Sequence, residues 1–167
     1  EREKVSLRFF NPETGTYDYI TPVKQNILLH PIDDAGIVIL NQRELSTIVS
    51  DLPPVFIINK NVGFDEAVTK GFPIASLDQT SETGESSLVT LNMRYLQEIP
   101  TEHAFQLSTL DDYNEDSIKG MSGAGIFIEA CEELYLNGIF TRFTDEDRGK
   151  VIYAQKLTSF NELLGNK

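Results

Sequence analysis

The chain has 167 residues, of which 40% are hydrophobic, so it is long enough and apolar enough to bury a core. Acidic residues outnumber basic ones by 26 to 14, and the formal net charge is −12. An acidic surface repels phosphate backbones, which argues against nucleic acid as the main partner. No apolar run approaches the roughly 20 residues of a membrane span, so we expect no membrane partner.

Strand-like runs dominate the chain and are separated by Gly, Pro, Asn and Asp, which favour turns. The predicted strands are residues 4–10, 17–20, 27–29, 36–40, 55–58, 67–70, 87–93, 104–107, 125–128, 134–140 and 150–154. Short strands at this spacing predict an all-β fold, an antiparallel barrel or sandwich. The run 36–40 is continuously apolar, so we expect this strand to be buried on both faces.

A short C-terminal helix is predicted by the sequence Ser159-Phe160-Asn161-Glu162. The serine and the glutamate have the spacing of a capping box, in which each side chain accepts a hydrogen bond from a main-chain amide at the helix start. Ser159 is therefore expected to cap the helix, and Gly165 to end it.

The chain contains one cysteine, Cys131, so no disulfide can form within it. Many secreted proteins depend on disulfides, and their absence favours a reducing, cytoplasmic location, the alternative being a bacterial secreted protein that never used them. No second thiol or histidine accompanies Cys131 in the sequence. We therefore predict no metal site and no cofactor.

The residues that indicate chemistry lie between 116 and 125, in the sequence DSIKGMSGAG. Gly120 and Gly123 surround Ser122, and glycines allow a tight turn that exposes a hydroxyl and directs amide groups to one point. A hydrolase elbow would need glycine at Ala124 and a helix after it. The sequence instead predicts two strands with an acidic turn between them, which favours a nucleophile loop that leads into a hairpin.

Segment 116–125 resembles the nucleophile loop of the trypsin-like serine peptidases, usually written Gly-Asp-Ser-Gly-Gly-Pro. Four further segments resemble that family in the same order along the chain. Residues 34–40 (DAGIVIL) are similar to the strand that begins with the catalytic aspartate, and residues 71–73 (GFP) to a turn of the bacterial members. Residues 136–140 (LNGIF) resemble the strand after the serine, and residues 151–154 with the final helix resemble the family's ending.

This resemblance implies two antiparallel six-stranded β-barrels of the trypsin/chymotrypsin type, the first incomplete, followed by a short helix. Residues 1–52 would be the remainder of the first barrel, and residues 53–167 the second barrel with the helix. Ser122 would be the nucleophile, Asp34 would orient a histidine, and the amides of Gly120 and Ser122 would form the oxyanion hole. The substrate pocket would be formed by Asp116, Thr141, Phe143 and Val151.

The resemblance also shows what the sequence lacks, because no segment upstream of Asp34 matches the family's histidine motif. His30 is too close to Asp34 in sequence, and His103 lies in the second half, so we expect both to be surface or structural residues. The catalytic histidine is therefore expected upstream of this sequence. Asp116 would favour Lys or Arg in the substrate, whereas the bulk of Phe143 and Val151 would narrow the pocket.

The function implied is serine endopeptidase activity through an acyl-enzyme intermediate, on a protein or peptide substrate. The alternative is a catalytically inactive domain of the same fold that binds peptides or serves as a scaffold. Besides its substrate, the chain would have as partners the missing N-terminal segment of the same protein and a fused or associated sensor or ATPase module, the latter by analogy of fold alone.

Overall fold

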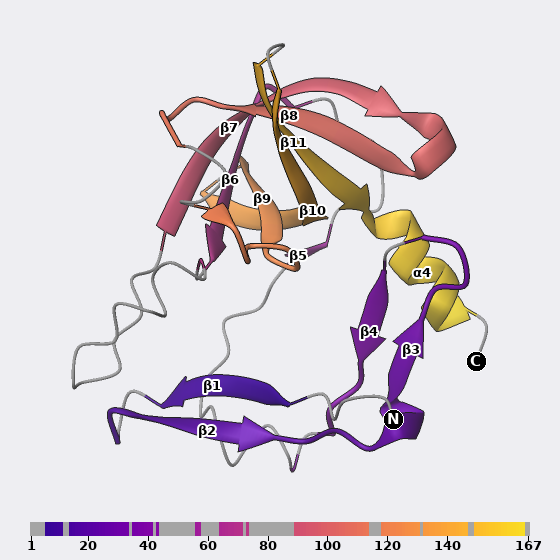
Figure 1. The fold of residues 1–167 in the computed structure, drawn as a ribbon. Coiled ribbons are helices and arrows are strands. Elements are labelled where there is room, and N and C mark those ends of the chain that lie inside the picture. The colour runs from indigo at the N-terminus through magenta and orange to yellow at the C-terminus, as the bar shows by residue number, and fades with distance from the viewer. Residues whose placement is uncertain are drawn as a thin grey trace.

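A computed structural model describes residues 6–11, 14–33, 35–41, 43, 56–57, 64–71, 73, 89–113, 118–130, 132–146 and 149–165 (Figure 1). In these ranges the strands are β1 (Leu7–Asn11), β2 (Thr16–Ile20), β3 (Ile27–Leu29), β4 (Gly36–Val38), β5 (Phe56–Ile57), β6 (Glu66–Gly71), β7 (Val89–Ile99), β8 (Ala104–Thr109), β9 (Gly125–Ala130), β10 (Glu133–Glu146) and β11 (Gly149–Lys156). The 3₁₀ turns η1 (Lys24–Asn26) and η2 (Pro100–Glu102) and the C-terminal helix α4 (Leu157–Gly165) complete them. The prediction of a mostly β fold with one short terminal helix is confirmed.

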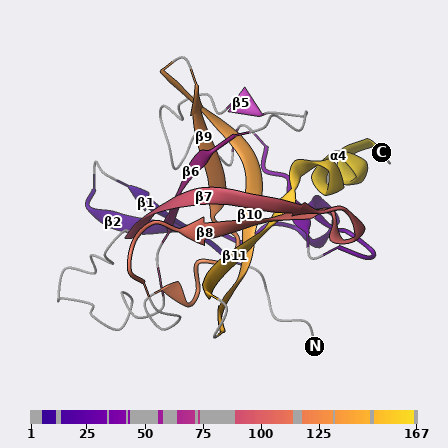
Figure 2. The ribbon, with the colours of Figure 1, turned by 90° about the horizontal axis from the view of Figure 1, so that it is seen from above.

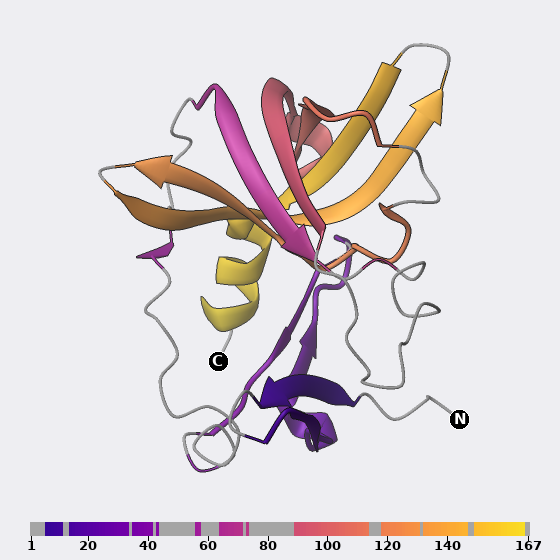
Figure 3. The same ribbon diagram turned by 90° about the vertical axis from the view of Figure 1, so that its left-hand side faces the viewer.

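Strands β6 to β11 form one closed, six-stranded antiparallel barrel. Around the barrel the order is β6, β7, β8, β11, β10 and β9, and β9 pairs with β6 to close it. Figures 2 and 3 show the barrel from above and from the side. β5 adds a short parallel strand beside β10. All six barrel strands lie within residues 53–167, the range predicted for the second barrel.

The first part of the chain forms two separate two-stranded antiparallel sheets, β1–β2 and β3–β4, in its described residues. Figure 1 shows β3 and β4 next to α4 and the β1–β2 hairpin at the bottom, away from the barrel. The prediction that the run 36–40 is buried on both faces is wrong. β4 ends at Val38, its Gly36 is exposed, and Ile37 is only half-buried, because a strand of a two-stranded sheet keeps one edge and much of its surface open.

The core lies inside the barrel, where inward-facing residues of several strands are fully buried, among them Leu91, Met93, Leu107, Ile126 and Ile152. One glycine is required by this packing. A Cβ atom at Gly138 of β10 would lie 2.7 Å from the Phe105 ring and 2.9 Å from the Gln155 carbonyl oxygen. The small residue therefore lets β10 approach the aromatic core closely.

The helix α4 begins at Leu157, directly after β11, so the prediction that Ser159 is its N-terminal cap is wrong. Ser159 lies inside the first turn and is fully buried. Its Oγ donates a hydrogen bond to Asp33 Oδ2 at 2.6 Å instead of accepting one from a helix amide. The tertiary contact with Asp33 thus replaces the local contact that the sequence pattern favours.

Candidate active site around Ser122

Ser122 is exposed at the tip of a turn that is anchored in the barrel core by the residue before it. Met121 is only 2% exposed and belongs to the core, whereas Ser122, the next residue, is exposed. Gly120 and Gly123 have φ angles of 95° and 94°, in the left-handed region that favours glycine. The turn is closed by the Ala124 amide, which donates to the Met121 carbonyl at 3.0 Å.

The main-chain amides of the turn divide into two kinds. The Gly123 amide donates to the Phe140 carbonyl at 2.8 Å, and the Met121 amide donates to the Ile118 carbonyl at 3.1 Å. The amides of Gly120 and Ser122 donate no hydrogen bond within the part of the chain that the structure describes. These two N–H groups are the ones expected to form the oxyanion hole, in which main-chain amides donate to an anionic oxygen.

A cavity of about 270 Å³ lies beside Ser122. It is lined by Ser122 and Gly123 of the turn, by Ala35 and Gly36, by 139–141 of β10 and by Phe160 of α4. Asp34 lies outside the described residues, but both of its neighbours are placed. The fold therefore brings the chain segment on the C-terminal side of Asp34 to the same cavity as Ser122, although 85 residues lie between Gly36 and Ser122 in sequence.

The residues expected to form the substrate pocket do not line one cavity. Thr141 lines the Ser122 cavity, and its Oγ1 donates to the Tyr153 carbonyl at 3.0 Å. Phe143 packs against the barrel core, and Val151 is half-buried in β11, paired with Thr144. Asp116 lies outside the described residues. Phe143 thus contributes to the stability of the barrel, and its side chain does not line the cavity at Ser122.

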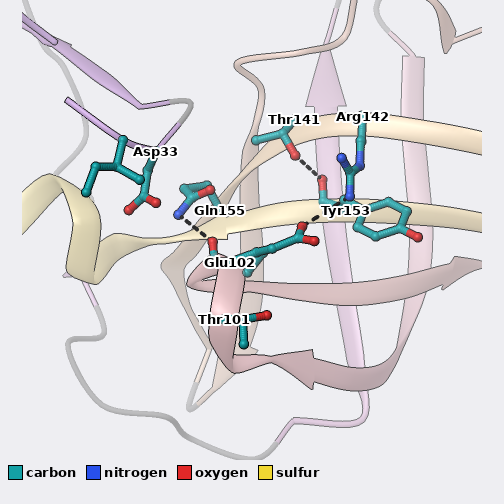
Figure 4. Close-up of a pocket in the computed structure, with 9 residues that line it drawn as sticks. Asp33, Thr101, Glu102, Thr141, Arg142, Tyr153 and Gln155 are labelled. Carbon is teal, nitrogen blue, oxygen red and sulfur yellow. Dashed lines mark hydrogen bonds and ion pairs between the residues drawn. The ribbon is translucent and has the colours of Figure 1, made fainter. Parts of the chain in front are cut away.

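A second cavity, of about 300 Å³, shares Thr141 with the first and is lined mostly by polar and charged residues (Figure 4). The Arg142 guanidinium lies over the Tyr153 ring, 4.1 Å from its centroid, and donates to Glu102 Oε2 at 3.1 Å. Asp33 and Gln155 line the opposite part of the cavity. Since Arg142 and Glu102 are both about half exposed, their ion pair contributes at most about 1 kcal/mol.

Both histidines contact Asp33, which the sequence did not single out. His103 Nδ1 lies 3.2 Å from Asp33 Oδ2, and His30 Nδ1 lies 3.6 Å from the same oxygen. The His30 side chain is only 7% exposed, so it is a structural residue but not a surface one. Asp33 was missed because Asp34 directly precedes the apolar run. Only the fold shows that Asp33 contacts His103 and Ser159, which lie 70 and 126 positions further along the chain.

The hydrogen bond from Ser159 is the main cause that lowers the pKa of Asp33 below its usual value of 3.8, and His103 and His30 act in the same direction. Burial opposes them, because it disfavours the charged form. Among the described residues, no group of three or more His, Cys, Asp and Glu side chains is arranged to hold a metal ion. The Asp33 carboxylate accepts hydrogen bonds from Ser159 and His103.

No family model matches this chain, and no curated protein matches it in sequence. In the described part of the chain, no helix is long and apolar enough to cross a membrane. The barrel and the geometry at Ser122 are therefore the observations that bear on the class of this protein.

Proposed function

We propose that this chain is part of a serine endopeptidase of the trypsin-like type. The observation that carries the proposal is the turn at Ser122, where an exposed serine, two amides with no acceptor among the described residues and a cavity shared with the segment that follows Asp34 come together. A closed six-stranded antiparallel barrel that ends in a short helix is also what the resemblance implies for residues 53–167. Residues 1–52 would then belong to a first barrel that other parts of the protein complete.

In the proposed reaction Ser122 Oγ attacks the scissile carbonyl carbon and loses its proton to a histidine supplied from outside this sequence. The carbonyl oxygen becomes an oxyanion and accepts hydrogen bonds from the amides of Gly120 and Ser122. The histidine then protonates the leaving amine, and water releases the acyl group from Ser122. Asp34 would orient the imidazole and stabilise its cationic form.

The place of this histidine is argued from the cavity and from the two histidines of the chain. His30 and His103 both contact Asp33, and neither of them is among the residues that line the cavity beside Ser122. This cavity is lined by Ser122 and by Ala35, the residue that follows Asp34 in sequence, and is large enough for an imidazole ring. A histidine on an upstream segment that enters this cavity would lie between the proposed nucleophile and the proposed aspartate.

A fluorophosphonate probe tests the proposal on the full-length natural protein. The Ser122 oxygen would displace fluoride from phosphorus, and we expect a phosphonylated peptide that contains Ser122. Ser122→Ala should abolish labelling, while Ser6→Ala, at another exposed serine, should leave it unchanged. Asp34→Asn should slow labelling by a factor on the order of 10⁴ at neutral pH. Labelling that survives in Ser122→Ala would show that the nucleophile is a different residue.

The engagement of both histidines at Asp33 favours a second candidate, an inactive domain of the same fold that binds peptides or serves as a scaffold. This candidate predicts that the full-length protein carries no histidine able to reach Ser122 and that the probe labels no serine. It also predicts that Ser122→Ala binds the natural partner as tightly as the wild-type protein does.

A further inference from the structure

The carboxylate of Asp33 joins three parts of the chain that are far apart in sequence. Its Oδ2 accepts a hydrogen bond from Ser159 Oγ in α4 at 2.6 Å and lies 3.2 Å from His103 Nδ1 at the start of β8. Gln155 at the end of β11 donates to Ser159 Oγ at 2.9 Å and to the His103 carbonyl at 3.0 Å. The Asp33 side chain is 10% exposed and Ser159 is fully buried, whereas the His103 side chain is about half exposed, so the Asp33–Ser159 contact is the shielded part of this network.

The loop that carries Asp33 is closed by its own hydrogen bonds. The Asp33 amide donates to His30 Nδ1 at 2.9 Å, the His30 amide donates to the Ala35 carbonyl at 2.9 Å, and the Ala35 amide donates to the Asp33 carbonyl at 2.8 Å. Because Nδ1 of His30 is an acceptor, Nε2 carries the proton of the neutral ring and donates to Glu162 Oε2 at 3.2 Å. The loop is therefore closed by hydrogen bonds of its own and attached to α4 at two points, by Asp33 to Ser159 and by His30 to Glu162.

The residues that follow Asp33 in this loop line the proposed site. Asp34 is the next residue after Asp33, and Ala35 and Gly36 line the cavity beside Ser122. A loop held this way keeps one position relative to the barrel, and small displacements of a reacting group are costly in rate. The contact between Asp33 and Ser159 therefore attaches to α4 the loop that leads to Ala35 and Gly36 at the Ser122 cavity.

We propose that Asp33 is a positioning residue for the Ser122 site, and that its ionised carboxylate, held by Ser159 and His103, fixes the loop that places Asp34. This inference rests on the proposed function, because Asp34 needs a fixed position only if it orients a catalytic histidine. The second cavity, which is lined in part by Asp33, Glu102 and Arg142, then lies beside this attachment.

The attachment depends on pH through Asp33, and both titratable and charged groups face this carboxylate. These groups are His30 in its own loop and His103 at β8, with Glu162 of α4 beyond His30 and with Glu102 and Arg142 across the cavity. The pKa of Asp33 is lowered in the fold. A lowered carboxyl pKa stabilises the folded arrangement fully above the usual value of 3.8, and this stabilisation is lost as the pH falls through the lower, folded pKa.

The test compares Asp33→Asn and Ser159→Ala with Asp111→Asn in the full-length protein. Asp111 is a matched control, because its Oδ2 also accepts two hydrogen bonds, from the amide and the side chain of Asn92, away from this loop. The first measurement is hydrogen exchange of the amides in residues 28–40 at neutral pH. We expect faster exchange there in Asp33→Asn and Ser159→Ala, and wild-type exchange in Asp111→Asn.

The second measurement is the kinetics of fluorophosphonate labelling at Ser122, separated into the reversible binding constant KI and the rate constant kinact. We expect kinact to fall by about 10- to 100-fold in Asp33→Asn and Ser159→Ala, with KI nearly unchanged. Wild-type labelling that neither variant changes overturns the positioning role alone. A loss expressed only in KI overturns it too, and a wild-type protein that is not labelled at all overturns the proposed function together with it.

Discussion

Truncation of Met121 tests whether the Ser122 turn is anchored in the barrel core. Met121 is 2% exposed, and a Cβ atom at Gly71 would lie 3.1 Å from its Cε, so the end of its side chain fills the space above β6. Met121→Ala removes three heavy atoms, at roughly 0.8 kcal/mol each, or about 2.4 kcal/mol from transfer alone. With the cavity that remains, we expect a loss of about 2–5 kcal/mol in the free energy of unfolding.

The chain has one other methionine, Met93, which provides the matched control. Met93 is fully buried in β7, and Met93→Ala should also lower the free energy of unfolding by about 2–5 kcal/mol. The two variants differ in where the native protein loosens. Only Met121→Ala should speed hydrogen exchange in residues 118–124 and slow labelling of Ser122, whereas Met121→Leu should cost less than about 1.5 kcal/mol.

Urea unfolding followed by far-ultraviolet circular dichroism measures the free energy of global unfolding. Hydrogen exchange under native conditions measures local opening of residues 118–124. A loss below about 0.5 kcal/mol in Met121→Ala would show that the side chain is not seated in the core, since changes of that size are typical of surface positions. Equal exchange in residues 118–124 for both methionine variants would show that the turn has no separate anchor at Met121.

Two other packing features lead to predictions of their own. In Gly138→Ala the new Cβ would lie 2.7 Å from the Phe105 ring, so we expect a loss of about 1–3 kcal/mol in urea unfolding, whereas Gly165→Ala, with open space around it, should change stability by less than about 0.5 kcal/mol. Thr69 is fully buried and donates to the Gly125 carbonyl at 2.7 Å. Thr69→Val keeps the shape but removes the donor, and a melt of this variant should show a loss of about 1–3 kcal/mol, while an unchanged stability would mean that the carbonyl finds another partner.

Most of the secondary structure could be predicted from the sequence because strands and turns have local signals. Alternating or continuous apolar runs bounded by Gly, Pro, Asn and Asp located each of the described strands to within a few residues, apart from the length of β7 and β10. These two strands continue for several residues beyond their apolar runs. Pairing with one neighbour extends them where side-chain pattern alone would end them, since β8 pairs with β7 as far as Ile99 and β11 pairs with β10 as far as Glu146.

The candidate nucleophile was also accessible to sequence reasoning, because its signal is local. Glycines on both sides of the Met121–Ser122 pair predict a turn that exposes one of the two residues, and the apolar side chain of Met121 decides which one is buried. The same reasoning failed for Ser159, whose capping-box spacing is a local signal that a partner from another part of the chain overrides.

What the sequence determined by itself is therefore the set of strands, the terminal helix and the conformation of the Ser122 turn. The tertiary structure alone decided that the strands close into a barrel, that Phe143 faces the core, and that Asp33 meets Ser159 and His103. The physical reason is the distance along the sequence over which each feature is determined. A turn depends on the φ angles of adjacent residues, whereas a buried carboxylate is stable only where the whole fold brings enough donors to it from distant parts of the chain.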